Sequence, residues 1–252
     1  MAELPSLSIV TACFNAADTL PETLQSVASQ RGVAVEHWVL DGGSGDATRG
    51  LLESADHPGL QWASERDAGV YDALNNGFAR ANGEVLGLLH ADDVFADEHV
   101  LHKVARMFAD PLVDVVYGDL QYVRREAPLE VVRHWASGQF ASSRLSWGWM
   151  PPHPTVFLRR RVWDAIGGFD LSYRIAADYE HMLRWMTREG VVVRYLPEVL
   201  VRMRLGGLSN RSFKNLVRKS REDLHAMHRH RVGGLATLMA KNLRKLPQFL
   251  GR

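Results

Sequence analysis

The chain has 252 residues, of which 46% are hydrophobic and 23% charged, as is typical of a soluble globular protein. Cys13 is the only cysteine, which excludes an intrachain disulfide and a zinc site made of several cysteines. The sequence contains no apolar run of membrane-spanning length and no evident signal peptide, so we expect a cytoplasmic location.

Charge is distributed unevenly along the chain. Residues 211–252 contain eleven Lys and Arg against two acids, a net charge of +9, and because the whole chain carries +1, residues 1–210 carry −8. A basic tail with interleaved apolar residues suits an anionic membrane surface, here the inner face of the plasma membrane. The acidic body argues against nucleic acid as a partner.

The first 93 residues alternate between strand and helix patterns. Periodic apolar residues predict a helix after Thr19, which stands at capping-box spacing from Glu22, and another helix over 71–80. Asp46 is suited to cap a helix between them. Short apolar runs predict strands at 7–11, 35–40, 60–63 and 85–89. Such alternation indicates an α/β fold, a mostly parallel sheet flanked by helices.

The second half is less regular, and a helical tail follows it. The pattern of residues 94–210 predicts helices at 98–108, 159–166 and 179–188 and an irregular loop over 136–154. It predicts strands at 113–117, 120–123, 131–135, 155–158, 191–195 and 199–204. Leu and Met recur at helical spacing from Leu235 to Leu250 with Lys and Arg between them, which predicts a basic amphipathic helix. A helix that packs back on the body or forms a dimer contact is equally compatible with this pattern.

Polar side chains follow the ends of all four predicted strands of the first half. Thr11 to Phe14, Asp41, Arg66 and Asp92 each stand just after an apolar run. Because the carboxyl ends of parallel strands meet at one edge of a sheet, where open α/β folds bind ligands, we expect these residues to converge there.

The fourth strand ends in two adjacent carboxylates, Asp92 and Asp93. Neighbouring carboxylates repel each other unless a positive group lies beside them, and a divalent cation that holds a diphosphate is one such partner. An acidic start to the following helix is the alternative explanation.

Six motifs in order over residues 6–210 resemble those of the family 2 glycosyltransferases with the GT-A fold, particularly the bacterial enzymes that build exopolysaccharides and other surface glycans. They are Thr11-Ala12-Cys13-Phe14-Asn15, Asp41-Gly42-Gly43-Ser44, Glu65 to Ala73 with Asn75 and Gly77, His90-Ala91-Asp92-Asp93, Gly167-Gly168-Phe169-Asp170 and Ala176-Ala177-Asp178-Tyr179-Glu180. The resemblance implies a catalytic domain over 1–210, with a nucleotide-binding half (1–93), a mixed acceptor-binding half (94–210) and the tail (211–252).

The resemblance implies transfer of a sugar from a nucleoside diphosphate donor of UDP or GDP type to a glycan or lipid-linked sugar acceptor, with inversion at the anomeric carbon. It places the nucleotide against Thr11, Ala12, Phe14, Asn15, Asp41, Arg66 and Asp67. Asp41 corresponds to the first acid of a pair that contacts the base, and Gly42 replaces the second. Arg66 corresponds to a diphosphate contact.

The resemblance also implies a metal ligand and a base. Asp92 corresponds to the last acid of the family's metal motif, whose first acid is His90 here, so Mg²⁺ or Mn²⁺ would be held through Asp92 with Asp93 or water. Asp178 corresponds to the catalytic base. The chemistry agrees with this pairing, because inverting displacement requires a base for the acceptor proton and an electrophile for the leaving diphosphate.

Three residues of the loop over 136–154 are candidates for sugar contact. The resemblance places a histidine at about the position of His153, near the donor or acceptor sugar, and Trp147 and Trp149 could form a flat platform on which a sugar stacks. A structural histidine and core packing of the tryptophans are the alternatives.

Two other functions remain open at this point. A sugar nucleotidyltransferase requires a Gly-rich basic loop after the first strand, but residues 12–18 contain no Gly, Lys or Arg. A non-catalytic nucleotide-sugar-binding module of the same fold is favoured only by the replacement of the first metal-motif acid by His90. The oligomeric state is open.

Overall fold

The computed structural model describes residues 4–125, 130–206 and 213–244. Its centre is a nine-stranded sheet in the order β3-β2-β1-β4-β8-β6-β9-β5, with β7 paired to β6. The strands are β1 (Leu7–Cys13), β2 (Val35–Asp41), β3 (Leu60–Ser64), β4 (Val85–Leu88), β5 (Val94–Phe95), β6 (Val115–Val123), β7 (Val131–Trp135), β8 (Phe157–Arg159) and β9 (Val193–Arg204). Strands β1 to β4 are mutually parallel, which confirms the predicted first half.

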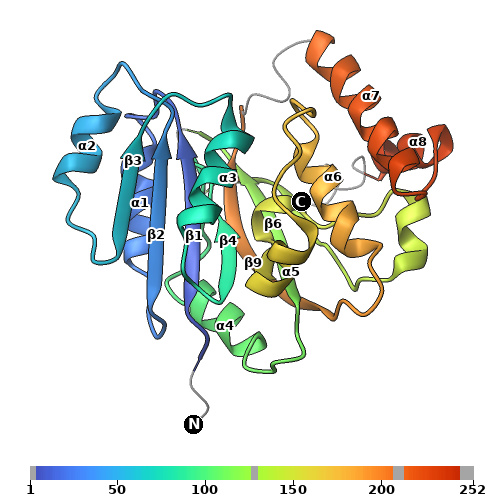
Figure 1. The fold of residues 1–252 in the computed structure, drawn as a ribbon, viewed down its shortest axis with the longest axis horizontal. Helices are drawn as coiled ribbons and strands as arrows, with labels where there is room; N and C mark the ends of the chain where they lie inside the picture. The colour runs from blue at the N-terminus through green and yellow to red at the C-terminus, as the bar shows by residue number, and fades with distance from the viewer. Residues whose placement is uncertain (1–3, 126–129, 207–212, 245–252) are drawn as a thin grey trace.

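The helices cover both faces of this sheet (Figure 1). They are α1 (Leu20–Ala28), α2 (Thr48–Ser54), α3 (Val70–Arg80), α4 (Val100–Met107), α5 (Arg160–Ile166), α6 (Ala177–Met186), α7 (Phe213–Arg229) and α8 (Leu235–Leu243). Side chains alternate along β1, so that Val10 joins the core beneath α3 and α6 while Leu7 and Ile9 join the core beneath α1 and α4. Two cores thus fix the sheet from opposite sides.

The second half of the sheet is mixed, as predicted, because β8 runs antiparallel to both β4 and β6. The prediction of two strands at 191–195 and 199–204 is wrong, since β9 is one continuous strand of 12 residues. The pairing with β6 shifts register between Tyr117 and Asp119, and Pro197 lies opposite this irregularity. A proline is tolerated where the ladder is interrupted, so it bends the strand without ending it.

Two local predictions also need correction. Thr19 makes no side-chain cap bond to α1, and Glu22 pairs instead with Arg204, so the capping box is absent. The predicted irregular loop over 136–154 contains a 3₁₀ helix, η1 (Ser142–Trp147), and begins a second, η2 (His153–Thr155). Short 3₁₀ turns carry too few residues to leave a periodic pattern.

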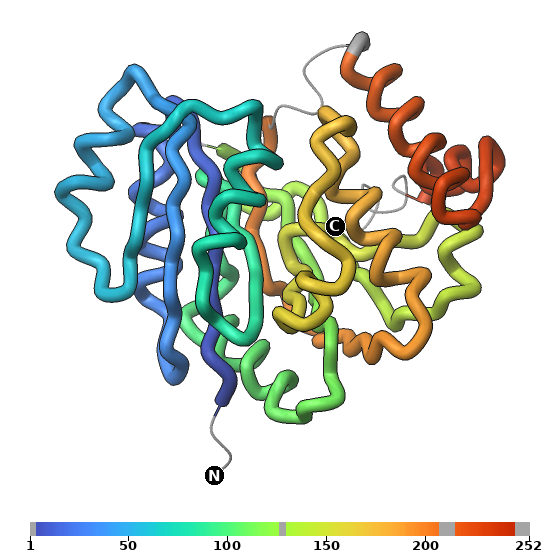
Figure 2. The backbone as a smooth tube through the Cα atoms, in the orientation of Figure 1, coloured from blue at the N-terminus to red at the C-terminus, as the bar shows by residue number. Residues whose placement is uncertain are grey.

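The tail helices lie at the end of the molecule opposite α2 (Figure 1 and Figure 2). Helix α7 packs on α6, and α8 packs on α7 and η1. The predicted boundary at residue 210 and the apolar residues after Arg244 lie outside the described residues. Within the described residues, no helix has the length and apolar character needed to span a bilayer.

Candidate active site

The loops after β1 and β2 are hydrogen-bonded to each other. The backbone N–H of Asn15 donates to Ser44 Oγ at 2.7 Å, and the Asn15 side chain accepts from the Gly45 N–H at 2.9 Å. The N–H of Ala16 donates to Thr48 Oγ1 at 2.9 Å. Asn15 has a φ of 48°, a conformation that asparagine tolerates better than most residues. The two loops therefore form one preformed edge of the sheet.

Asp41 is the centre of this edge. It is only 1% exposed, and its carboxylate accepts hydrogen bonds from the Ser44 N–H, the Ser44 hydroxyl at 2.5 Å and the Ser64 hydroxyl at 2.6 Å. Three strand ends, those of β1, β2 and β3, meet around it, because Cys13 Sγ also lies 3.9 Å away. Asp41 thus shapes the loops with its carboxylate oxygens engaged.

A carboxylate fills the space next to Gly42, where the resemblance leads one to expect a second acid. A Cβ at residue 42 would lie 2.7 Å from Asp67 Oδ2. Asp67 is held there because its Oδ1 accepts from the Gly69 N–H at 2.8 Å. The adjacent Arg66 is exposed, and its Cγ would lie 3.3 Å from a Cβ at Gly43. The loop after β3 therefore brings an acid and a cation to the loop after β2.

The residues predicted to contact the nucleotide in the β1 loop differ in exposure. Thr11 is fully buried, and its hydroxyl lies 3.0 Å from His37 Nε2, so its side chain faces β2. Ala12 is half-buried, whereas Phe14 is 65% exposed at the rim. An exposed aromatic side chain at this rim offers a flat surface on which a base can stack.

The turn after β4 is fixed from two sides. Its backbone closes through the Asp93 N–H, which donates to His90 O at 2.9 Å, and the Thr23 hydroxyl of α1 donates to Asp93 O at 2.9 Å. From β9, Arg204 Nη1 donates to Asp92 O at 2.9 Å. The turn is therefore rigid although it lies in a loop.

The two adjacent acids of this turn have different surroundings. Asp92 is half-buried, whereas Asp93 is 1% exposed and accepts from the Arg204 backbone N–H at 3.1 Å. Burial, together with the charge of Asp92, raises the pKa of Asp93 well above its ordinary value. Asp92 is therefore the more accessible anionic ligand of the pair.

Asp178 lies in the first turn of α6. The loop before it is hydrogen-bonded by one residue of α7 and one of α3. Glu222 of α7 accepts hydrogen bonds from the backbone N–H groups of Arg174 (3.2 Å), Ile175 (2.8 Å) and Ala176 (2.9 Å). Tyr71 of α3 donates to Ile175 O at 2.9 Å. Burial, and then the charge of Asp178, raise the pKa of Tyr71 well above its ordinary value.

Two histidines lie within the electrostatic influence of Asp178. Burial lowers the pKa of His90, while the charges of Asp92 and Asp178 act on it in the opposite direction. Burial likewise lowers the pKa of His153 to about 4, against the charge of Asp178. Both imidazoles are therefore neutral at pH 7 and lie within electrostatic reach of Asp178. The 3₁₀ helix η2, which begins at His153, contacts both β4 and α6.

The tryptophans of that loop have different environments. Trp149 is buried, donates to Ser137 O at 2.8 Å and packs edge-on against Tyr117, with ring centroids 5.8 Å apart. Its ring faces the core, so core packing explains it better than sugar stacking. Trp147 is 68% exposed at the end of η1.

Metal ligands in the described part of the chain do not form a closed cage, since no cluster of three or more His, Cys, Asp or Glu side chains is found there. The candidate donors are the half-buried Asp92 carboxylate and the neutral His90 imidazole, and Asp93 Oδ2 is buried without a partner. Mg²⁺ is commonly held by one or two carboxylates with substrate phosphates and water. The residues present fit a cation that arrives with a diphosphate.

Sequence reasoning missed several residues that build the site. The Asn75 side chain accepts a hydrogen bond from the Phe169 N–H at 2.8 Å and donates one to Phe169 O at 2.9 Å. These two bonds join α3 to the loop before Asp178. Tyr71 and Asn75 share one motif, and their spacing on one helix face was the available signal. Glu222 had no such signal, because it lies in the tail.

Comparisons with known proteins identify the family of this chain. Residues 8–169 match the family described as Glycosyl transferase family 2. The chain is 34% identical over 193 residues to an uncharacterized glycosyltransferase of Mycobacterium tuberculosis, covering 73% of this chain and 70% of that protein. It is 34% identical over 211 residues to a PGL/p-HBAD biosynthesis glycosyltransferase of Mycobacterium bovis, covering 82% and 80%.

Solved structures share the fold. The Pyrobaculum calidifontis mannosyltransferase PcManGT, in complex with GDP-Man and Mn²⁺, has a TM-score of 0.67 at 20% identity over 98% of this chain and 74% of its own. A truncated Staphylococcus aureus TarS with UDP-GlcNAc has a TM-score of 0.67 at 16% identity, covering 97% and 78%; the chain spans 43% of the longer TarS structure. The predicted GT-A fold is confirmed. The chain belongs to glycosyl transferase family 2.

Proposed function

We propose that this glycosyltransferase moves a sugar from a nucleoside diphosphate donor to an acceptor hydroxyl with inversion, using Asp178 as general base. The observation that supports this proposal most directly is the contact of η2, which begins at His153, with both β4, which leads to Asp92, and α6, which carries Asp178. These carboxylates come from different halves of the chain. One can face the diphosphate and the other the acceptor, as an in-line displacement requires.

Asp178 takes the proton from the acceptor hydroxyl as that oxygen attacks the anomeric carbon. The bond from that carbon to the diphosphate oxygen breaks, and no enzyme nucleophile is needed. Neutral His153 and His90 beside it can donate hydrogen bonds without adding charge that would oppose proton transfer to the carboxylate.

The leaving diphosphate needs positive charge, which the site supplies from two directions. Arg66 is exposed beside Gly43, at the edge of the nucleotide site. Asp92, with His90 and Asp93 next to it, would hold Mg²⁺ or Mn²⁺, which when bound acts as a Lewis acid on the diphosphate oxygens. The neighbour crystallised with GDP-Man and Mn²⁺ supports this assignment.

The nucleotide lies against the joined loops after β1, β2 and β3. Phe14 stacks on the base, and the backbone at Thr11 and Ala12 lines the floor with Asn15, Asp41 and Asp67 behind it. Neighbours bound to UDP-GlcNAc and to GDP-Man support a donor of UDP or GDP type. Since relatives carry names from PGL/p-HBAD and succinoglycan biosynthesis, we place the acceptor among surface glycans and lipid-linked sugars.

A thermal-shift screen of UDP, GDP, CDP and dTDP, with and without Mn²⁺, tests this proposal. One nucleotide should raise the melting temperature in a metal-dependent way, because a ligand that binds the native state alone stabilises it. The matching sugar nucleotides, mixed with polyprenyl-linked and free glycans, should then release nucleoside diphosphate. Stabilisation without any release would instead support the binding module, and no stabilisation by any nucleotide would refute the proposal.

A further inference from the structure

The tail helices expose an unusual share of apolar side chains. Thirteen large hydrophobic residues are exposed in the described part of the chain, and five of them lie on α7 and α8, a small part of its length. They are Leu216, Val217, Leu235, Met239 and Leu243. Leu235, Met239 and Leu243 follow one another at intervals of four, so they form one stripe along α8. We call α7 and α8 together the tail hairpin.

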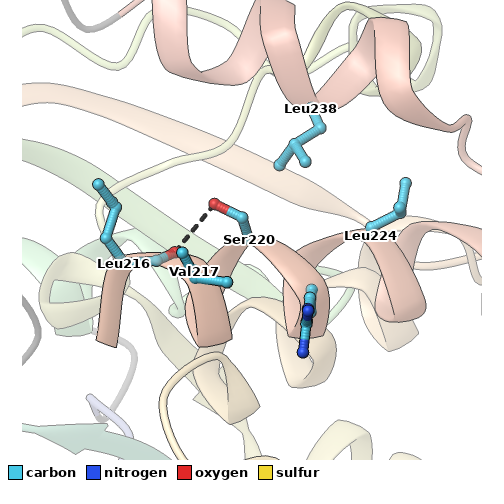
Figure 3. A pocket seen from close by; sticks show the side chains of 6 residues that line it. Leu216, Val217, Ser220, Leu224 and Leu238 are labelled. Carbon is cyan, nitrogen blue, oxygen red and sulfur yellow. Dashed lines mark hydrogen bonds between the residues drawn. The ribbon is translucent and has the colours of Figure 1, made fainter. Parts of the chain in front are cut away.

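An apolar groove runs between the two helices of the tail hairpin (Figure 3). Leu216, Val217 and Leu224 line it from α7, and Leu238 points into it from α8. The Ser220 hydroxyl in the same groove is satisfied within α7, because it donates to Leu216 O at 3.0 Å. The groove is therefore lined mainly by apolar side chains, and its one hydroxyl group already has a hydrogen-bond partner.

The side of the tail hairpin that faces away from the groove contacts the loop before Asp178 and α6. Glu222 bonds the loop before Asp178, and Asp223 forms a buried ion pair with Lys241 at 2.8 Å. Lys241 Nζ also lies 3.1 Å from the centre of the Tyr179 ring. The hairpin is thus held in one orientation on α6.

These internal bonds leave the outer side of the tail hairpin positively charged. Glu222 and Asp223 are the only acids between residues 213 and 244; Glu222 bonds the loop before Asp178, and Asp223 pairs with Lys241 inside the hairpin. Exposed cations remain at Arg218, Arg221 and Arg244. The rest of the chain up to residue 210 carries a net charge of −8, so the hairpin is the basic face of an acidic protein.

A tryptophan extends this face beyond the hairpin. A Cβ at Gly148 would lie 2.4 Å from the Lys241 backbone nitrogen, so the end of η1 touches α8. Trp147, the preceding residue, is exposed. Tryptophan beside apolar side chains and arginine is the composition of a surface that lies at a bilayer interface.

We propose that the tail hairpin docks the enzyme on an anionic phospholipid bilayer, with its groove and α8 stripe in the headgroup region. The charge complementarity favours lipid, because anionic headgroups attract the exposed arginines while apolar side chains enter the interface. Glu222 then sets the Asp178 loop at a fixed position relative to the membrane. This last consequence rests on the proposed function; docking itself does not.

Vesicle flotation of the full chain tests the docking. Vesicles of equal parts phosphatidylglycerol and phosphatidylcholine should bind the protein, and pure phosphatidylcholine should bind it at least about tenfold more weakly, because the arginines add electrostatic attraction. The triple variant Leu235→Ser, Met239→Ser, Leu243→Ser should lose about tenfold or more in binding, since interfacial affinity scales with buried apolar area. Leu112→Ser with Leu171→Ser removes exposed apolar residues elsewhere and should bind as the parent does.

A second set of variants keeps the result decisive. Arg218→Gln with Arg221→Gln and Arg244→Gln should weaken binding to anionic vesicles, whereas Arg31→Gln with Arg49→Gln and Arg188→Gln should not. Unfolding curves and circular dichroism check that each variant folds. Equal flotation of the parent and both tail variants would overturn the proposal, whatever the turnover of the enzyme.

Other occupants of the groove give distinct results. If the terminal variant Leu246→Ser, Phe249→Ser, Leu250→Ser alone lost vesicle binding, residues 245–252 would carry the docking and the proposal would be wrong. If the parent were a dimer by light scattering and the α8 triple variant a monomer, a second copy of the chain would cover this face. The first result would move the docking to another segment, and the second would replace the bilayer by a second copy of the chain.

Discussion

The two halves of the site are held in different ways. In the first half, the loops after β1 and β2 bond to each other, and Asp41 joins three strand ends within one parallel sheet. In the second half, the loop before Asp178 is held by Tyr71, 104 positions before its partner Ile175, and by Glu222, 47 positions after it. The first half is built from its own residues, and the second depends on distant ones.

The difference has a physical origin. Strand ends of a parallel sheet are positioned by the ladder and need only short loops to converge. The start of α6 has no such ladder, so its three preceding N–H groups require an acceptor from elsewhere, which Glu222 provides. Substitutions in the two halves should therefore have separable effects on donor binding and on turnover.

The largest expected effect is that of Asp178→Asn. Turnover should fall by roughly 10²- to 10⁴-fold, the usual contribution of a general base, while nucleotide stabilisation in the thermal-shift assay should stay unchanged. The matched control is Asp164→Asn, which makes the same change at an exposed carboxylate on α5 and should leave turnover normal. A variant at Asp178 with near-normal turnover would remove the base from the mechanism.

Asp92→Asn should affect the leaving diphosphate rather than the acceptor proton. We expect loss of the metal-dependent part of nucleotide stabilisation and a fall in turnover of about 10²-fold or more, because the leaving diphosphate loses its electrophile. Asp93→Asn is the comparison next to it in the chain, and we expect a smaller loss of the metal response, since that carboxyl is buried with a raised pKa and accepts from the Arg204 N–H. If Asp93→Asn abolished the metal response and Asp92→Asn did not, the ligand assignment would be reversed.

The same contrast explains how much could be predicted from the sequence. Apolar runs followed by polar residues predicted β1 to β4 and the residues that follow them, because this half obeys local periodicity. The long strand β9 was split at Pro197, since a tolerated bulge reads as a strand end. The buried environment of Trp149 and the role of Glu222 depend on tertiary contacts between residues distant in the chain, which leave no periodic signal.

Glu222→Ala tests the dependence of the acceptor half on the tail. We expect turnover to fall by about tenfold with the donor KM unchanged, because a loosened loop misplaces the base without touching the nucleotide site. Glu222→Gln keeps one acceptor oxygen and should have a smaller effect. Glu189→Ala, an exposed acid between α6 and β9, is the control. A rise in donor KM alone would mean that the tail acts on the nucleotide half instead.

The pH dependence of stability also divides between the halves. Burial lowers the pKa of His37 to about 3 in the first half, and that of His153 to about 4 and His181 to about 3 in the second. The unfolded chain binds these protons near pH 6.5, whereas the native protein does not, so stability is full above that pH and falls as the pH drops toward 4.

His181→Gln should therefore flatten this pH dependence. Urea unfolding between about pH 7 and pH 5 should show roughly one proton fewer taken up on unfolding than in the parent. His228→Gln, on the exposed side of α7, should leave the slope unchanged. In the first half, the raised pKa of Asp93 opposes the lowered pKa values of His37, His57 and His90, so these groups partly cancel in the slope.

The smallest effect concerns Gly42 and Asp67, within the self-contained half. Gly42→Asp places a second carboxylate next to Asp67 Oδ2, and we expect nucleotide affinity to fall by about three- to tenfold through charge repulsion and displacement of the loop. Because the space holds one carboxylate, adding Asp67→Gly to Gly42→Asp should recover most of that loss, measured as the Kd of the matching nucleotide by calorimetry. Additive losses in the double variant would show that Asp67 does not take the place of the acid missing at residue 42, and that the two positions act independently.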